Sequence, residues 1–578
     1  MKRNSVIRSL CKWSWAAFAG LFSLGLAHVV MSAPAQEPLF LAQPVRPIMM
    51  LNMSRDHQLF FKLYDDYSNI TDGRRTIDGQ PNPNYGGAPD AEGEADTSYV
   101  HGYNYYGYFD SEKCYEYNTT SNRFNPTRIT DDGYCNAGGV NNEWSGNFLN
   151  WTSMTRMDAV RKILYGGMRQ QGQDTSSITV LERAFLPQDA HSFAKYYNGT
   201  DIGSLTPFGN ITMGQSNNDS GITICNTTEP TNRNNLSQSD TGAPLMRIAR
   251  GNFSLWASNE RWQCRWGMAA NDNNPALSGI VAHTSSPANS GSNNRRLGGR
   301  DFIVRVKVCD STLEHGGENC KDYNGALKPI GLLQEYGEDD QIHFGLMTGS
   351  YTKNKSGGVL RKTVGSMVDE VNANGTFKIP ASGNSIVGTL DRLRIYGYRF
   401  DDGTYHRGSH SNNNDGSDAC VWSRSSFSDG HCTNWGNPQS EIFLESLRYL
   451  SGQTPNSAFV ANDSGRIAGL NTATWDKPVT NNNYCAPLSV LQFNASTSSY
   501  DDERDRDQIN AADIGLANVD IATNAVGEEE GIHGNSYFVG ENGAVNDANS
   551  HQLCTAKSVG ALADVRGTCP DAPRLEGS

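Results

Sequence analysis

The chain has 578 residues, of which 37% are hydrophobic and 19% are charged. This length suits several domains, and this composition excludes both a membrane-spanning bundle and a charge-rich disordered chain. The formal net charge is −14 at pH 7, and no basic stripe follows the N-terminal segment, so the sequence argues against a nucleic-acid partner.

Residues 1–35 have the pattern of a secretory signal peptide. Four basic residues within the first twelve positions precede an apolar run over 13–31, and Ala33-Pro34-Ala35 is a small-residue cleavage site. The apolar run is long for a signal peptide, so an uncleaved anchor is the alternative. Either interpretation predicts export. No later stretch is apolar enough to span a bilayer, and none suggests a transmembrane partner.

Residues 45–51 form a short apolar run that predicts a buried strand. A helix is predicted around 155–165, because Thr155 can cap its start, Asp158 suits its first turn and Gly166-Gly167 can end it. The expected buried face of this helix contains Met157, Val160 and Leu164.

Seven aromatic residues cluster between positions 103 and 117. They are Tyr103, Tyr105, Tyr106, Tyr108, Phe109, Tyr115 and Tyr117. Tyrosine provides a large amphipathic contact area, so the cluster is a candidate adhesive surface. Packing within the fold is the simpler interpretation and the one that we favour.

Residues 198–300 are rich in Asn, Ser, Gly and Thr with little periodicity, which predicts a low-complexity insertion. Alternating or apolar runs then predict strands over 302–308, 342–347 and 488–493. A helix over 438–450 would have Asn437 as its cap and Pro438 at its first position. The expected buried residues of this helix are Phe443, Leu447 and Leu450. Strands that alternate with helices favour an α/β sheet that long insertions interrupt.

The twelve cysteines favour disulfides in an oxidising compartment. No pair has CxxC spacing, which argues against zinc-ribbon and thioredoxin-like sites. Most fall into couples that are close in sequence, although sequence alone does not fix their connectivity. The candidate pairs are Cys114 with Cys135, Cys225 with Cys264, Cys309 with Cys320, Cys420 with Cys432, and Cys554 with Cys569. Of the other two, Cys11 lies in the predicted signal peptide, and Cys485 is left over, which suggests a partner outside this chain.

The sequence has no GxSxG, HExxH, Walker A or GxGxxG motif. His191 lies close to Asp189 and is the most suggestive histidine, but a lone histidine in such a setting is more often a structural hydrogen-bonding residue. We therefore predict no catalytic residue. A secreted hydrolase with a site around Asp189 and His191 is the least favoured alternative.

Residues 66–73 (DYSNITDG) place oxygen-bearing side chains at alternate positions, as calcium loops do. The candidate ligands are Asp66, Ser68 and Asp72. Ile70 occupies a ligand position and no bidentate glutamate stands at the expected distance, so a solvated turn is the favoured interpretation.

Residues 143–151 (EWSGNFLNW) and their continuation at 155–167 (TRMDAVRKILYGG) closely resemble the N-terminal half of the PilC/PilY family of type IV pilus biogenesis factors and tip-associated adhesins. Supporting segments are 106–110 (YGYFD), 187–192 (PQDAHS), 356–362 (SGGVLRK) and 569–577 (CPDAPRLEG). These segments are spread over nearly the whole chain that follows the predicted signal peptide.

The resemblance implies a von Willebrand factor A-like α/β region, followed by a C-terminal β-propeller with the family's calcium loop. We expect the propeller to be absent from these 578 residues. On this basis 36–197 would be the first part of the von Willebrand A-like region and 301–545 its remainder. The insertion 198–300 would separate the two parts, and 546–578 would be a linker toward the propeller.

A von Willebrand A-like region usually binds a metal ion through a DxSxS motif after its first strand and an aspartate after a central strand. The matching positions here are Asn52, Ser54, Asp56 and Asn494, so both signature aspartates are asparagines. An asparagine oxygen can bind a cation but brings no charge. The resemblance therefore implies a retained fold with a degenerate, inactive metal site. We expect no cofactor, and bound calcium or magnesium is the alternative.

The resemblance further implies an exported assembly factor and tip-associated adhesin that works by binding, without catalysis. Its partners would be type IV pilin and minor pilin subunits together with a host or abiotic surface. It would lie in the periplasm, at the outer surface or at the pilus tip. A standalone surface adhesin without a role in assembly is the alternative.

Overall fold

The structure is a computed structural model in which Met1–Arg46 and Pro47–Ser578 separate as two units. It describes residues 45–64, 76–77, 80–81, 99–136, 142–209, 221–229, 242–257, 263–266, 296–313, 317–379, 384–400, 403–405, 429–494, 519–537, 557–558 and 560–561. The predicted signal peptide lies outside these residues. None of the helices described is both long and apolar enough to cross a membrane.

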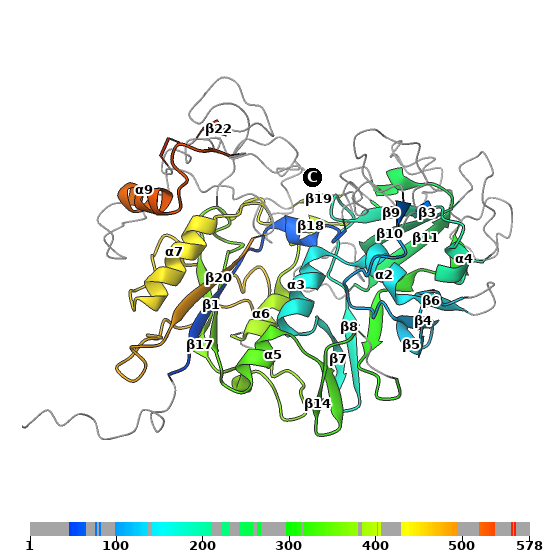
Figure 1. Cartoon of the computed structure of the whole chain (residues 1–578), viewed down its shortest axis with the longest axis horizontal. Helices are drawn as coiled ribbons and strands as arrows, with labels where there is room; N and C mark the ends of the chain where they lie inside the picture. Colours follow the sequence, from blue (N-terminus) through cyan, green and yellow to red (C-terminus); the bar gives the residue numbers. More distant parts are fainter. Residues whose placement is uncertain are drawn as a thin grey trace, which may run out of the picture. The chain divides into compact units, whose positions relative to one another are not determined.

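The first sheet is built around β1 (Ile48–Met53), which is almost entirely buried. Its strand order is β17-β16-β1-β20, where β16 spans His343–Thr348, β17 spans Val359–Gly365 and β20 spans Leu488–Phe493 (Figure 1). Both β16 and β20 run parallel to β1, and β17 is antiparallel to β16. Met53 pairs with both Thr348 and Phe493, so the three parallel strands end at the same edge. The predicted strands 45–51, 342–347 and 488–493 are thereby confirmed within a few residues.

Helices cover both faces of this sheet (Figure 1). On the face of Leu51, a shared hydrophobic core contains residues of α3 (Arg156–Tyr165), α5 (Leu332–Gly337) and α6 (Ile386–Arg392). On the opposite face, α7 (Gln439–Leu450) contacts β1, and its Ser446 hydroxyl donates a hydrogen bond to Asn52. A parallel sheet needs such cover on both faces, because its strands are apolar on both sides.

Helix α3 begins and ends as the sequence predicts. Thr155 caps it and forms a capping box with Asp158, and Gly166 ends it in the left-handed conformation, with φ of 85°. Met157 and Leu164 are buried, and Val160 is half-buried against the same core.

The predicted buried face of α7 is only partly confirmed. Leu450 is buried, but Leu447 is half-buried and Phe443 is 43% exposed. The residues that are buried also include Ile442, Ser446 and Tyr449. Ser446 donates a buried hydrogen bond to Asn52 on this face, and a hydrophobicity pattern does not predict a buried polar contact of this kind. Asn437 does not cap the helix either, because Pro438 occupies the N-cap position.

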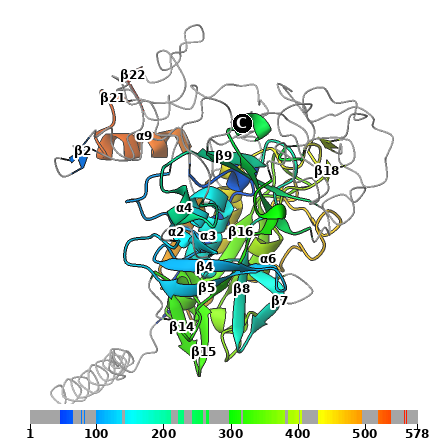
Figure 2. The ribbon, with the colours of Figure 1, turned by 90° about the vertical axis from the view of Figure 1, so that its right-hand side faces the viewer.

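A second region, within residues 99–313, contains two further sheets (Figure 2). The larger has strand order β6-β4-β5-β13-β8-β7, and the smaller has β12-β11-β10-β9. The strands of the larger sheet are β4 (Lys113–Asn118), β5 (Arg123–Ile129), β6 (Glu143–Ser145), β7 (Arg169–Thr175), β8 (Ile178–Glu182) and β13 (Arg305–Val308). Those of the smaller are β9 (Phe193–Tyr197), β10 (Ile222–Thr228), β11 (Pro244–Arg250) and β12 (Phe302–Ile303). The predicted strand 302–308 therefore divides between the two sheets.

The remaining elements are short or peripheral. The helices are η1 (His57–Phe60), α2 (Gly146–Ser153), α4 (Ile202–Leu205), η3 (Ser254–Ala257), η4 (Leu297–Gly299), η5 (Met367–Asp369) and α9 (Val519–Glu529). Two-stranded pairs are formed by β2 (Thr76–Ile77) with β3 (Gln80–Pro81), β14 (Cys320–Tyr323) with β15 (Ala326–Pro329), β18 (Tyr398–Arg399) with β19 (Thr404–Tyr405), and β21 (Ser536–Tyr537) with β22 (Lys557–Ser558). In the part of the chain that the structure describes, the fold is thus mixed α/β with several sheets and no closed barrel.

The predicted insertion at 198–300 contains regular structure. Strands β10 and β11 lie inside it, and β10 pairs with β9, which precedes residue 198. All seven residues of β10 are buried although four of them are polar, so the strand has neither a continuous apolar run nor a sustained alternation of polar and apolar residues. Its polar side chains are satisfied internally; Asn226, for example, donates to the carbonyl of Thr152 at 2.6 Å.

The aromatic cluster is mainly part of the core. Tyr105, Tyr108, Phe109 and Tyr115 are at most 2% exposed. Two members are exceptions, since Tyr103 is 43% and Tyr106 is 42% exposed. Packing within the fold is thus confirmed for most of the cluster.

Three of the predicted disulfides are present: Cys114–Cys135, Cys225–Cys264 and Cys309–Cys320. Cys432 is also disulfide-bonded, and its predicted partner Cys420 lies outside the described residues. Cys554 and Cys569 also lie outside the described residues, so their predicted pairing stays a prediction. Cys485 is a free, exposed thiol, as its leftover position in the sequence suggested.

Candidate functional site

Polar side chains meet where β1 and β20 end, at the positions that the resemblance assigns to a metal ion. The Ser54 hydroxyl donates to the Asn437 Oδ1 at 2.8 Å, and the Asn437 Nδ2 donates to the Asn494 Oδ1 at 2.8 Å. Ser54 is fully buried. The parallel register brings the ends of β1 and β20 together, and the turn before α7 supplies Asn437. We call Ser54, Asn437 and Asn494 the amide junction.

Asn52 lies close to the amide junction but forms no direct hydrogen bond with its three residues among the bonds described. Its Nδ2 donates to the Gln492 Oε1 at 2.9 Å, and its Oδ1 accepts from Ser446. Gln439 in turn accepts from Gln492 and donates to Asn437. Asn52 and Asn437 are therefore linked through two glutamine side chains.

Asp56, the one carboxylate among the four predicted ligands, serves the backbone. It caps η1, where the Gln58 N–H donates to its Oδ1 at 2.9 Å. Its own N–H donates to the Ser54 Oγ at 3.1 Å. The four predicted positions are thus close together, but three of them are neutral.

Arg55 places a positive charge beside the amide junction. The residue is 3% exposed, and its guanidinium donates to the carbonyl oxygens of Ser350 at 2.7 Å and of Gly436 at 3.3 Å. It also bonds the Thr433 carbonyl. The guanidinium thereby holds the turn after β16 against the turn before α7. A buried cation at this place opposes the binding of a second cation.

A second cluster contains His191, the histidine that the sequence singles out. Its Nδ1 lies 2.9 Å from the Asp189 carboxylate, and its Nε2 lies 3.2 Å from the Nδ1 of His57. Tyr405 donates to the same carboxylate. Asp189, His191 and His57 are each at most 3% exposed. The sequence offered no signal for His57, which lies 134 positions from His191.

Asp189, His191 and His57 form a hydrogen-bonded chain, as the acid and base of a catalytic triad do, but no nucleophilic side chain continues it among the described residues. Burial, reinforced by His191 and Arg55, holds the pKa of His57 well below its ordinary value, so this imidazole is neutral. Its Nε2 has no hydrogen-bond partner within the described part of the chain. Among the same residues, no serine, threonine or cysteine side chain hydrogen-bonds either imidazole. The cluster joins the segment after β1 to the 187–192 segment through these hydrogen bonds.

Two other groups of residues are candidates for metal binding. Asp66, Ser68 and Asp72 lie outside the described residues. Cys309, Glu318 and Cys320 lie within 4.8 Å of one another, but the two cysteines form a disulfide with each other, which leaves one carboxylate.

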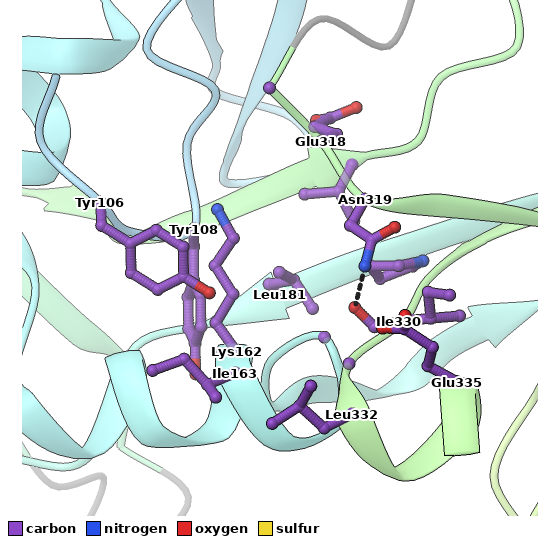
Figure 3. Close-up of a pocket in the computed structure, with 15 residues that line it drawn as sticks. Tyr106, Tyr108, Lys162, Ile163, Leu181, Glu318, Asn319, Ile330, Leu332 and Glu335 are labelled. Carbon is purple, nitrogen blue, oxygen red and sulfur yellow. Dashed lines mark hydrogen bonds between the residues drawn. The ribbon is translucent and has the colours of Figure 1, made fainter. Parts of the chain in front are cut away.

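A pocket of about 240 Å³ lies beside the C-terminal end of α3 (Figure 3). Its apolar walls come from Tyr106, Tyr108, Ile163, Leu181, Val308, Pro329, Ile330 and Leu332, and its polar groups include Lys162, Glu318, Asn319 and Glu335. Two glycines allow the 329–332 segment to approach α3 this closely. A Cβ at Gly331 would lie 2.5 Å from the Ile163 carbonyl oxygen, and one at Gly166 would lie 2.5 Å from that of Pro329.

The charged groups of the pocket have unusual surroundings. Lys162 donates to the Gly107 carbonyl, and its Nζ lies 4.5 Å from the centre of the Tyr106 ring. Burial lowers its pKa to about 8. Burial likewise raises the pKa of Glu318, against the effect of Lys113, whose Nζ lies 2.8 Å from its Oε2. Sequence reasoning missed both residues, because neither belongs to a motif.

Comparison with known proteins identifies related sequences. A family described as "PilY1 homolog, small alpha/beta domain" matches residues 96–249, and one described as "PilY1 homolog, second domain" matches residues 344–578. A protein of Xylella fastidiosa (strain Temecula1), named type IV pilus biogenesis factor PilY1 homolog, is 31% identical over 565 residues, which cover 92% of this chain and 34% of that protein. Another protein of the same name and organism is 29% identical over 253 residues, covering 42% of this chain and 17% of that protein. No solved structure matches the chain.

This chain thus spans about a third of the length of the first of these relatives. The two family matches lie in different halves of the chain, and the similarity to that relative runs through nearly all of it. The chain belongs to the PilY1 homolog family.

Proposed function

We propose that this chain is an exported type IV pilus assembly factor and tip-associated adhesin, which acts by binding proteins and surfaces. The observation that carries the proposal is the 31% identity over 92% of the chain to a relative named type IV pilus biogenesis factor PilY1 homolog. The disulfides support export, because such bonds persist in oxidising compartments. The partners would be pilin and minor pilin subunits.

The sheet around β1 would be the von Willebrand A-like region. Its order, β17-β16-β1-β20, has three parallel strands that end at one edge and helices on both faces, which supports this assignment. The amide junction would replace the bound metal ion of such a region. Side-chain hydrogen bonds already occupy its amide and hydroxyl groups, and Arg55 supplies the positive charge that an ion would bring. We therefore propose binding that needs no calcium or magnesium.

The discriminating experiment is a clean deletion of the gene, scored for surface pili and twitching motility in normal and retraction-deficient backgrounds. An assembly factor predicts that pili disappear and return when retraction is blocked. Normal pili with reduced attachment would instead favour a standalone adhesin. An unchanged strain would contradict both roles.

The hydrolase alternative is tested separately. Asp189 and His191 form a hydrogen-bonded pair, so a hydrolase that used them would lose activity in His191→Ala. The proposal expects no hydrolytic activity in the wild-type protein in a broad substrate screen. Activity that disappears in His191→Ala would overturn it.

A further inference from the structure

We propose that the pocket beside α3 binds a lysine or arginine side chain that a partner protein presents next to an apolar residue. The inference rests on the proposed function in one respect, namely that the chain acts by binding another protein. It adds the chemistry of that partner and the place where it docks.

The size of the pocket indicates a side chain. Pockets for small-molecule ligands usually have volumes of about 300–1,000 Å³, and this one has about 240 Å³. Its mouth carries exposed apolar groups, since Ile163 is 42%, Tyr106 is 42% and Leu332 is 39% exposed. Exposed apolar side chains around a small concave site are typical of an interaction surface, in which one side chain anchors the partner.

The charges favour a cationic anchor. Lys113 lies 2.8 Å from Glu318 and 3.3 Å from Asp110, and the same two carboxylates stabilise the charged form of Lys162 electrostatically. The two positive charges of these lysines balance the two negative charges of the carboxylates. Glu335 on α5 is exposed, lines the pocket and forms no ion pair with any described residue, so the mouth has an excess negative charge.

Two further features point the same way. The Glu318 side chain is only 6% exposed, and its Oε1 has no hydrogen-bond partner among the described residues, so it can accept from an entering donor. The C-terminal end of α3 also borders the pocket, and the C-terminal end of a helix attracts positive charge. The aliphatic stem of lysine or arginine suits the apolar walls of the pocket.

The test is a selection of short random peptides displayed on phage against the purified, disulfide-bonded chain. The Glu335→Lys/Leu332→Ser double variant serves for counter-selection, so that only pocket-dependent peptides remain. Both residues are exposed, so the variant should unfold at the wild-type temperature. The proposal expects a consensus with a basic residue beside an apolar one. No pocket-dependent peptide, or a consensus without a basic residue, would overturn it.

The affinity of a selected peptide provides the decisive comparison. Glu335→Lys should weaken it roughly fivefold or more, and exchange of the basic residue of the peptide for glutamate should restore binding to that variant. The matched control is Asp131→Lys, which makes the same change of charge at an exposed site away from the pocket lining and should leave the affinity unchanged. Equal affinity of wild type and Glu335→Lys would refute the proposal. This assay uses no pili, so its outcome is independent of the genetic test of the proposed function. The peptide can fail to bind while the deletion abolishes pili, and the peptide can bind while the deletion leaves pili unchanged.

Discussion

Replacement of Asn437 by alanine should destabilise the protein, because this residue holds the amide junction together. Its side chain accepts from the Ser54 hydroxyl, accepts from Gln439 and donates to Asn494. Asn437 is 1% exposed and Ser54 is fully buried, so water cannot replace the bond between them. The substitution therefore leaves a buried hydroxyl without its acceptor.

The expected loss follows from these contacts. A side-chain hydrogen bond contributes about 1 kcal/mol net, and a buried polar group left without a partner costs about 1–3 kcal/mol. The bonds to Gln439 and Asn494 are only partly buried and contribute less. We expect Asn437→Ala to lower the free energy of unfolding by about 2–4 kcal/mol.

Urea unfolding followed by tryptophan fluorescence measures this loss. Trp435 is a local reporter, because it precedes Asn437 by two positions and its ring lies 5.6 Å from that of His57. The control is Asn482→Ala at an exposed position, which should change the free energy of unfolding by less than about 0.5 kcal/mol. A double-mutant cycle with Ser54→Ala should give a coupling energy of about 1 kcal/mol. An Asn437→Ala protein as stable as this control would show that the amide junction does not contribute to stability.

Two buried carboxylates yield further predictions. Burial raises the pKa of Glu445 to about 7, so its charged form is disfavoured in the folded protein and the resulting penalty grows as the pH rises from about 4.3 to about 7. Glu445→Gln should therefore raise the unfolding temperature at pH 8 and lose this advantage at pH 4; the same gain at both values would contradict the assignment. The carboxylate of Asp463 pairs with Arg361, both fully buried, so Asp463→Asn should cost about 3 kcal/mol by leaving an unpaired guanidinium. Urea unfolding should show that Asp463→Asn/Arg361→Met recovers part of this loss, and an Asp463→Asn protein of wild-type stability would argue against the pair.

The sequence predicted those elements that have local signals. Helix α3 has a capping box at its start and glycines at its end, so both its limits could be read from neighbouring residues. Strands β1, β16 and β20 are short apolar runs, and the three confirmed disulfides join cysteines that are close in sequence. Strand β10 could not be predicted in the same way, because four of its seven buried residues are polar, so it shows neither the apolar run nor the sustained alternation that indicates a strand.

The candidate site depends even more on contacts between residues that are far apart in the sequence, which local patterns do not predict. Asn52, Ser54 and Asp56 follow one strand, and a resemblance is enough to identify them. Asn437 lies 383 positions from Ser54, and in sequence it has the features of an ordinary helix cap. The contact between His57 and His191 likewise depends on the packing of distant segments.

Protein binding without a metal ion is the property of this chain that most needs a direct test. The most direct measurement is the binding of the purified, disulfide-bonded chain to purified pilin and minor pilin subunits, by surface plasmon resonance, in EDTA and in excess calcium and magnesium. We expect saturable binding to at least one subunit with the same affinity in both conditions. Binding to none of the subunits, or binding only when divalent cations are present, would contradict it.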